Sequence, residues 1–275
     1  MRWAGWTRLL ADAGTALCAL VLLLFVVSAL WPELLAPGDP LAADRGLVLA
    51  PPSPEHPFGT DEIGRDVYTR VVHGARSSLA LGFGAVLIAV TVGTVFGLVA
   101  GLSRRVVSTV TLRIADIGAA FPELILAIFI LALFGGGLGT ATLAIGIAGI
   151  PSYVRVVRAE AVKVKASAYI EASYGLGLAP RAVLLRHILP NAVRPVLIIA
   201  TIGLGGATLA GAALSFLGLG SPPPTSEWGA MLSNARNFLT LGWWAAVFPG
   251  LAITVFVISS TVIGRWINAS REGRA

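Results

Sequence analysis

The chain has 275 residues, of which 56% are hydrophobic and only 12% are charged, and its mean hydropathy is +0.84. Soluble domains carry about 25% charged residues, so this composition excludes an ordinary soluble fold and predicts an all-α membrane protein. The net charge of +6 does not indicate a nucleic-acid partner, because membrane orientation explains the positions of the basic residues better. The single cysteine, Cys18, excludes an intrachain disulfide.

The first predicted transmembrane helix covers residues 13–31, a run without charge. A cleaved signal peptide is the alternative, but the run is longer than the usual apolar core of such peptides and no clear cleavage site follows it. We therefore expect a retained helix, with Trp3, Trp6 and Trp31 as interfacial anchors. Residues 32–58 are rich in proline and acidic residues, which favours an irregular external segment.

The next stretch, residues 60–76, has the pattern of a short amphipathic helix. Thr60 is a good N-cap, and apolar residues then recur every four positions, at Ile63, Val67 and Val71. We expect this helix either to lie along the membrane surface or to pack on the helical bundle.

Five further apolar segments bring the number of predicted transmembrane helices to six. They cover residues 78–102, 114–134, 140–157, 196–217 and 243–263. In the first of these five, Gly93, Gly97 and Gly101 lie four residues apart, the spacing of a small-residue face for close helix packing. We interpret Trp228, in the expected external loop over residues 219–241, as an interfacial anchor rather than a docking aromatic.

The basic residues orient these helices. With the N-terminus in the cytoplasm, 15 of the 20 Lys and Arg residues lie on the cytoplasmic side, as the positive-inside rule requires. Six transmembrane helices then place both termini in the cytoplasm. We expect an N-terminal unit over residues 1–77, a core of five helices over residues 78–266 with a cytoplasmic loop at 158–194, and a cytoplasmic tail over residues 267–275.

Within that cytoplasmic loop, residues 171–190 are too polar to span a membrane but have the features of a folded element. The pattern predicts a short helix over residues 166–174, a turn at Gly175 and Gly177, and a second short helix that begins at Pro180. We expect an ordered helical projection that is built to contact another protein.

The residue types exclude several chemistries. A P-loop requires a Gly-Lys-Ser/Thr sequence, whereas the only two lysines, Lys163 and Lys165, each follow a valine. Metal-ligand spacing is absent from the sequence, and the predicted spans lack the groups of an intramembrane enzyme, so we predict no metal site and no catalysis. Asp116 lies near a helix end. Glu123 could line a polar pathway, be neutral and hydrogen-bonded, or precede its span; a proton-driven transporter that uses Glu123 is one alternative function.

Three stretches resemble the permease subunits of ABC importers. The first is similar to the EAA loop of these permeases, with Ser173 at a position that is usually alanine and His187 at one that is usually isoleucine. The positions of the motif are occupied here by Glu171, Ala172, Ser173, Gly177, His187, Ile188, Leu189 and Pro190. The second resembles the external segment of the C-type subunit of dipeptide and oligopeptide transporters, and it includes Thr60, Asp61, Gly64, Arg65 and Asp66. The third, residues 214–232, resembles the same subunits.

The resemblance implies a type I ABC importer permease fold with six transmembrane helices in the bacterial inner membrane. The partners that it implies are a B-type permease subunit, which completes a heterodimeric pathway, two cytoplasmic ATPase subunits or one fused ATPase, and an extracytoplasmic solute-binding protein. It implies no cofactor in this chain, because ATP and Mg would be bound by the ATPases.

The implied role is that of a non-catalytic subunit for the uptake of di- and oligopeptides, with nickel chelates, glutathione or haem as alternative cargo. Residues 171–190 would contact an ATPase, with Gly177 allowing the turn between their two helices. The external segment around Thr60 would either contact the binding protein or cap the bundle.

Overall fold

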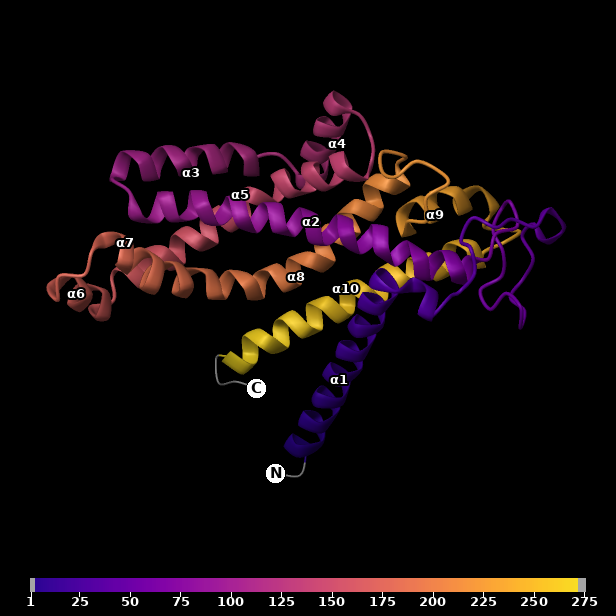
Figure 1. The fold of residues 1–275 in the computed structure, drawn as a ribbon, viewed down its shortest axis with the longest axis horizontal. Helices are drawn as coiled ribbons and strands as arrows, with labels where there is room; N and C mark the ends of the chain where they lie inside the picture. Colours follow the sequence, from indigo (N-terminus) through magenta and orange to yellow (C-terminus); the bar gives the residue numbers. More distant parts are fainter. Residues whose placement is uncertain (1–2, 272–275) are drawn as a thin grey trace.

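A computed structural model describes residues 3–271, which are almost entirely helical (Figure 1). The α-helices are α1 (Trp3–Leu30), α2 (Val67–Leu102), α3 (Arg105–Ala119), α4 (Glu123–Phe134), α5 (Leu138–Lys165), α6 (Ala168–Gly175), α7 (Pro180–Val183), α8 (Leu189–Phe216), α9 (Trp228–Ala235) and α10 (Trp244–Arg271). A π-helical turn, η3 (Leu184–Ile188), joins α7 to α8, and short 3-10 turns lie at η1 (Pro32–Leu34), η2 (Arg45–Leu47) and η4 (Arg236–Phe238). In the described range, five helices can cross a membrane, or six if α3 and α4 form one broken span.

The centre of the bundle is the packing of α2 against α5. The predicted small-residue face is confirmed, because each of its three glycines meets a side chain of α5. A Cβ added at Gly93 would lie 2.5 Å from the Cβ of Tyr153, and one added at Gly97 would lie 2.5 Å from the Cβ of Val157. At Gly101 the distance to the Cβ of Ala161 would be 2.9 Å. Such distances are too short for real carbon atoms, so larger residues on this face of α2 would force the two helices apart.

Helix α1 diverges from the rest of the bundle and meets it near its C-terminal end (Figure 1). There Phe25 packs edge-on against Trp228, with ring centroids 5.3 Å apart. Of the proposed interfacial anchors, Trp31 is exposed, whereas the side chains of Trp3 and Trp6 lie outside the described residues. The predicted tail, residues 267–275, is likewise only partly described: residues 267–271 form the end of α10, and the remainder lies outside the described residues.

The separate amphipathic helix predicted over residues 60–76 is wrong. Helix α2 begins at Val67, with Asp66 as its N-cap, and continues without interruption to Leu102. Upstream of it, Gly64 adopts φ +86°, a left-handed conformation that cannot continue a helix. The carboxylate of Asp61 accepts two backbone N–H groups within the same turn, which stabilises the turn in place of a first helical turn.

The third predicted span, residues 114–134, is broken rather than straight. Helices α3 and α4 meet at an angle of 86°, and Pro122 is the N-cap residue of α4. Proline restricts the residue before it to extended conformations, which explains the end of α3 at Ala119. The break leaves Glu123 as the first residue of α4, while Asp116 on α3 forms an ion pair of 3.0 Å with Arg155 on α5.

The loop after α8 contains a helix, and the interpretation of Trp228 as an interfacial anchor is wrong. Trp228 is the first residue of α9 and is 0% exposed, with its indole nitrogen donating to the carbonyl oxygen of Val71 at 2.9 Å. Its neighbour Glu227 caps α9 and accepts a hydrogen bond from the Ser78 hydroxyl at 3.1 Å. These contacts hold α9 against α2, so the tryptophan lies in the protein core.

Candidate functional site

The chain between α5 and α8 forms a compact projection at one end of the molecule, opposite the end that holds α9 and the external segment (Figure 1). The projection comprises α6, a turn over residues 176–179, α7 and the π-helical turn. Helix α7 begins at Pro180, where proline lacks an N–H group that the helix would leave unpaired in any case. The helix, turn and second helix expected from the sequence are therefore confirmed.

The turn between the two short helices depends on Gly177, whose φ is +78°. The N–H of Gly177 donates to the carbonyl of Tyr174 at 3.0 Å, and the N–H of Leu178 donates to the carbonyl of Ser173 at 3.2 Å. Together these bonds form a Schellman motif, which satisfies the last carbonyl groups of α6. The motif requires a left-handed residue, and glycine adopts that conformation without steric cost.

The projection has a small apolar core of its own. Ile170 of α6, Val183 of α7 and Ile188 of the π-helical turn are buried against one another, and Leu98 and Leu102 of α2 pack against them. The projection is thus anchored to the end of the longest helix in the bundle, which makes it an ordered element rather than a loose loop.

The structure divides the predicted coupling residues into an exposed group and a group that supports the projection. The exposed group consists of Glu171, Ala172 and Gly177. The partly buried residues are His187, Leu189 and Pro190, and the fully buried ones are Ser173 and Ile188. The hydroxyl of Ser173 donates to the carbonyl of Tyr169 at 2.7 Å, one helical turn earlier in the same chain. Ser173 and Ile188 therefore stabilise the projection from within.

Three exposed apolar side chains in α6 and the turn after it were not predicted from the sequence. Tyr169, Tyr174 and Leu176 are all exposed, and Leu176 is 82% exposed. The signal was available, because these are large apolar residues in a segment predicted to lie in the cytoplasm. Together with Glu171 and Ala172 they form a surface that we call the tip.

The projection is joined to the bundle by continuous helices. Residues 180–216, from α7 through the π-helical turn to the end of α8, form one helical segment of 37 residues. Helix α5 enters the projection from the other side and is continuous from Leu138 to Lys165. The helical segment begins at residue 180, earlier than the start of the next span at residue 196 expected from the sequence. This continuity gives the projection two helical connections to the membrane region.

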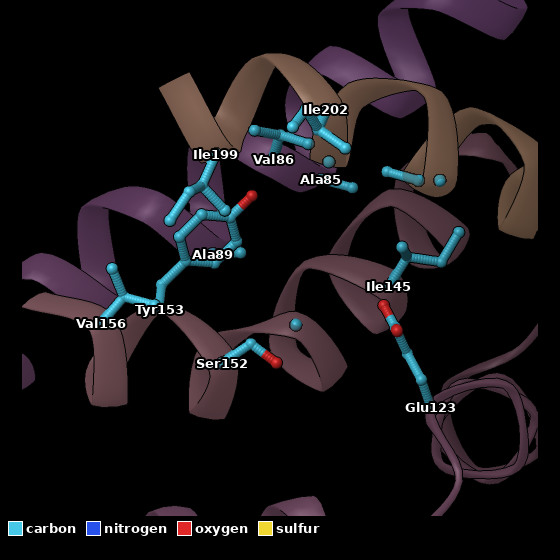
Figure 2. A pocket seen from close by; sticks show the side chains of 14 residues that line it. Ala85, Val86, Ala89, Glu123, Ile145, Ser152, Tyr153, Val156, Ile199 and Ile202 are labelled. Atoms are coloured by element: carbon cyan, nitrogen blue, oxygen red, sulfur yellow. The ribbon is translucent and has the colours of Figure 1, made fainter. Parts of the chain in front are cut away.

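Those two helices also line a cavity of about 290 Å³ in the middle of the bundle (Figure 2). Helices α2 and α4 complete its walls, which are largely apolar, with residues such as Ala89 and Ile145. The polar side chains that line it are those of Glu123, Ser152 and Tyr153. A helical connection therefore runs from the projection to the walls of this cavity.

Glycines lie beside two polar groups of the cavity, and one of them is needed to make room. Glu123 extends from α4 toward Ile145 on α5 (Figure 2), and a Cβ added at Gly149 would lie 3.9 Å from its Oε1 atom. On α8, a Cβ added at Gly203 would lie 2.5 Å from the Tyr153 hydroxyl, closer than any real contact of that kind. The phenol thus fits only because residue 203 has no side chain.

At the opposite end of the molecule, the predicted external residues form a buried network. The Asp61 carboxylate pairs with Arg65 Nε at 2.6 Å and lies 3.5 Å from Arg70 Nε, and all three side chains are buried. Thr60 is also buried; its hydroxyl donates to the Leu47 carbonyl and accepts the N–H of Ala50 at 2.8 Å. This network closes the external end of the bundle.

The remaining two external residues define the start of α2. The Asp66 carboxylate accepts the N–H of Thr69 at 2.7 Å, and Gly64 provides the left-handed turn that precedes it. Across residues 3–271, no cluster of three or more His, Cys, Asp or Glu residues has the arrangement of a metal site.

Comparison with known proteins gives a consistent result. Residues 93–272 match the family described as the inner membrane component of binding-protein-dependent transport systems. The dipeptide transport system permease protein DppC of Alkalihalophilus pseudofirmus is 41% identical over 240 residues, covering 87% of this chain and 79% of the relative. The di/tripeptide transport system permease protein DppC of Pseudomonas aeruginosa is 38% identical, covering 94% of this chain and 88% of the relative. The glutathione transport system permease protein GsiD of Pectobacterium atrosepticum is 36% identical, with coverages of 94% and 86%.

Solved structures agree on the fold. The MetNI methionine ABC transporter in an inward-facing conformation matches with a TM-score of 0.55 and 20% identity, over 72% of this chain and 96% of that one. An amino acid ABC transporter matches with a TM-score of 0.55 and 18% identity, over 76% of this chain and 95% of that one.

Proposed function

Because the chain belongs to the family of inner membrane components of binding-protein-dependent transport systems, we propose that its tip receives the movement of a cytoplasmic ATPase and that its cavity forms part of a peptide pathway. The chain is a non-catalytic permease subunit of an ABC importer and a multi-pass protein of the bacterial inner membrane. Its fold is that of a type I ABC importer permease.

The proposed cargo is a di- or oligopeptide. The names of the most similar relatives support this proposal, since they specify dipeptides, di- and tripeptides and glutathione, which is itself a tripeptide. The mainly apolar cavity with a few polar groups is also suitable for short peptides, whose side chains vary while their main chain and end groups stay constant.

The observation that carries the proposed coupling role is the continuity of α5 and α8. Both helices extend from the projection to the cavity, so a displacement of the tip moves two of the cavity walls directly. To shift the ratio of two conformations of the permease from 1:99 to 99:1, a ligand must supply about 5.5 kcal/mol of differential binding energy. Continuous helices can transmit such a bias, whereas a flexible loop would dissipate it.

ABC importers of this family work with a partner permease, an ATPase and a binding protein. For this chain we propose a B-type permease subunit as the other half of a heterodimer. We further propose two ATPase subunits, or one fused ATPase, which bind ATP and Mg beneath the projection. An extracytoplasmic solute-binding protein would deliver the cargo.

Site-directed cross-linking tests the proposed contact. The chain has one cysteine, Cys18, so a variant with Cys18→Ala and Leu176→Cys carries a single thiol at the exposed tip. Labelled with a photoreactive group in the full complex, this variant is expected to form an adduct with an ATPase subunit. The matched control is Leu34→Cys, which replaces a residue that is 73% exposed at the external end, and it should give no such adduct. Equal yields of ATPase adduct from both positions would contradict the proposal.

A further inference from the structure

We propose that Glu123 binds the primary ammonium group of the cargo peptide inside the membrane. This inference rests on the proposed function and deepens it, because it assigns a charged group of the cargo to one residue of the pathway. Glu123 lines the central cavity and stands at the break between α3 and α4. Its position, its surroundings and the chemistry of the cavity all point to a cationic ligand.

The position of Glu123 along the bundle places it at the depth of the hydrocarbon core. Helix α3 has 15 residues and begins at Arg105, so it places Glu123 about 22 Å from the cytoplasmic end of that helix, at 1.5 Å per residue. That distance lies within the hydrocarbon core, which is about 30 Å thick. Glu123 is nevertheless exposed in this chain. A carboxylate exposed to lipid at this depth is costly, so this face of the bundle faces a polar pathway or the partner subunit.

The Glu123 carboxylate has no basic partner among the described residues. Glu123 forms no ion pair with any described residue, whereas other acids, such as Asp61 and Asp116, do. The lining of the cavity contains no lysine, arginine or histidine. The carboxylate therefore lacks a cation from the described part of its own chain, and a carboxylate at such a depth is stabilised by an opposite charge.

The shape and polarity of the cavity also suit a cationic ligand. Gly203 leaves room for the Tyr153 hydroxyl, and a Cβ added at Gly206 would meet no atom within 4 Å. One acid and two hydroxyl groups between apolar walls match an ammonium group attached to a small apolar body. An anionic chelate would instead meet a like charge.

Two sources of a primary ammonium group exist in peptides, the amino terminus and the lysine side chain. We probe both with three dipeptides: Ala-Phe, N-acetyl-Ala-Phe and N-acetyl-Ala-Lys. Saturation-transfer NMR on the detergent-purified full complex, without the binding protein, detects weak binding directly. Omission of the binding protein matters, because that protein would impose its own selection on the cargo.

In the wild-type complex, Ala-Phe is expected to bind about tenfold more tightly than N-acetyl-Ala-Phe, since a hydrogen bond to a charged group contributes about 1.5 kcal/mol. Glu123→Gln should abolish this preference. Glu160→Gln, which removes the same charge from α5 outside the cavity, should retain it. Binding of N-acetyl-Ala-Lys at the strength of Ala-Phe would show that any ammonium group suffices, and binding at the strength of N-acetyl-Ala-Phe would restrict the site to the amino terminus.

Three outcomes would overturn the inference: no saturation transfer from the wild-type complex, equal binding of Ala-Phe and its acetylated form, or an unchanged preference in Glu123→Gln. If Glu123→Gln fails to assemble, Glu123→Asp serves instead, and its shorter carboxylate should retain a reduced preference. ATP-driven uptake of Ala-Phe by the complete wild-type system is measured in parallel. If the wild-type system takes up no Ala-Phe, the proposed function is refuted. If it takes up Ala-Phe but the binding experiment shows no preference for an ammonium group, only the role of Glu123 is refuted.

Discussion

The two ends of the molecule use polar residues in opposite ways. At the external end, Asp61, Arg65 and Arg70 are buried and paired with one another. At the cytoplasmic end, the projection buries apolar residues and exposes Glu171 and its neighbours at the tip. Buried charges must be matched within the chain, whereas exposed groups remain free to meet a partner.

This difference separates residues that maintain the fold from residues available for contact. Both ends contain a stretch that resembles permease family sequences, yet their side chains have different surroundings in the structure. Substitutions at the external network should therefore act through stability, and substitutions at the tip should act through coupling. The following predictions test that contrast, from the largest expected loss of stability to the smallest.

The largest loss is expected from Asp61→Ala. It removes the partner of Arg65 at 2.6 Å and leaves a buried guanidinium without its main counter-charge, a change that costs about 3–5 kcal/mol. The measurement is the free energy of unfolding of the purified complex in denaturant. Glu62→Ala is the matched control, because Glu62 is more exposed and contacts the same arginine at 3.2 Å, so its loss should cost no more than about 1 kcal/mol. Similar losses from both variants would contradict the assigned role of the buried network.

An intermediate effect is expected from Gly177→Val. A β-branched residue at φ +78° strains the turn by about 1–2 kcal/mol, although no neighbouring atom obstructs the new side chain. We expect normal membrane insertion but strongly reduced ATP-dependent uptake, measured in proteoliposomes. Gly175→Val is the control, since Gly175 ends α6 without a positive φ and also faces open space. Normal uptake by Gly177→Val would contradict the requirement for an ordered turn.

The smallest loss of stability is expected from Leu176→Ser. The side chain is 82% exposed, so the free energy of unfolding should change by less than about 0.5 kcal/mol. Peptide uptake and the ATPase activity stimulated by the loaded binding protein should nevertheless fall together, because an apolar contact with the ATPase is lost. Leu34→Ser at the external end serves as the comparison and should leave both activities unchanged. Unaltered coupling in Leu176→Ser would remove Leu176 from the proposed contact surface.

Several features of the fold followed from the sequence because they depend on local pattern. The apolar runs predicted the long helices, and the spacing of Gly93, Gly97 and Gly101 predicted a close helix contact, although only the structure shows that α5 is the partner. The turn at Gly177 followed from glycine and from Pro180, whose preferences are properties of the residues themselves. Two residues of the tip, Glu171 and Ala172, were predicted from the sequence as contact residues, whereas Tyr169, Tyr174 and Leu176 were not.

Other features required the tertiary structure. Residues 60–66 have helical spacing, but the pairing of Asp61 with Arg65 and Arg70 and the turn at Gly64 outweigh that local preference. The burial of Trp228 depends on the carbonyl of Val71, which is distant in the sequence.

The sequence by itself therefore determined the class of protein, its helices and its polar projection, because hydropathy and turn chemistry are local. Only the tertiary structure decided which polar residues are buried in pairs and which, like Glu171 and Glu123, remain exposed. That choice depends on contacts between segments far apart in the chain, which periodicity alone does not encode.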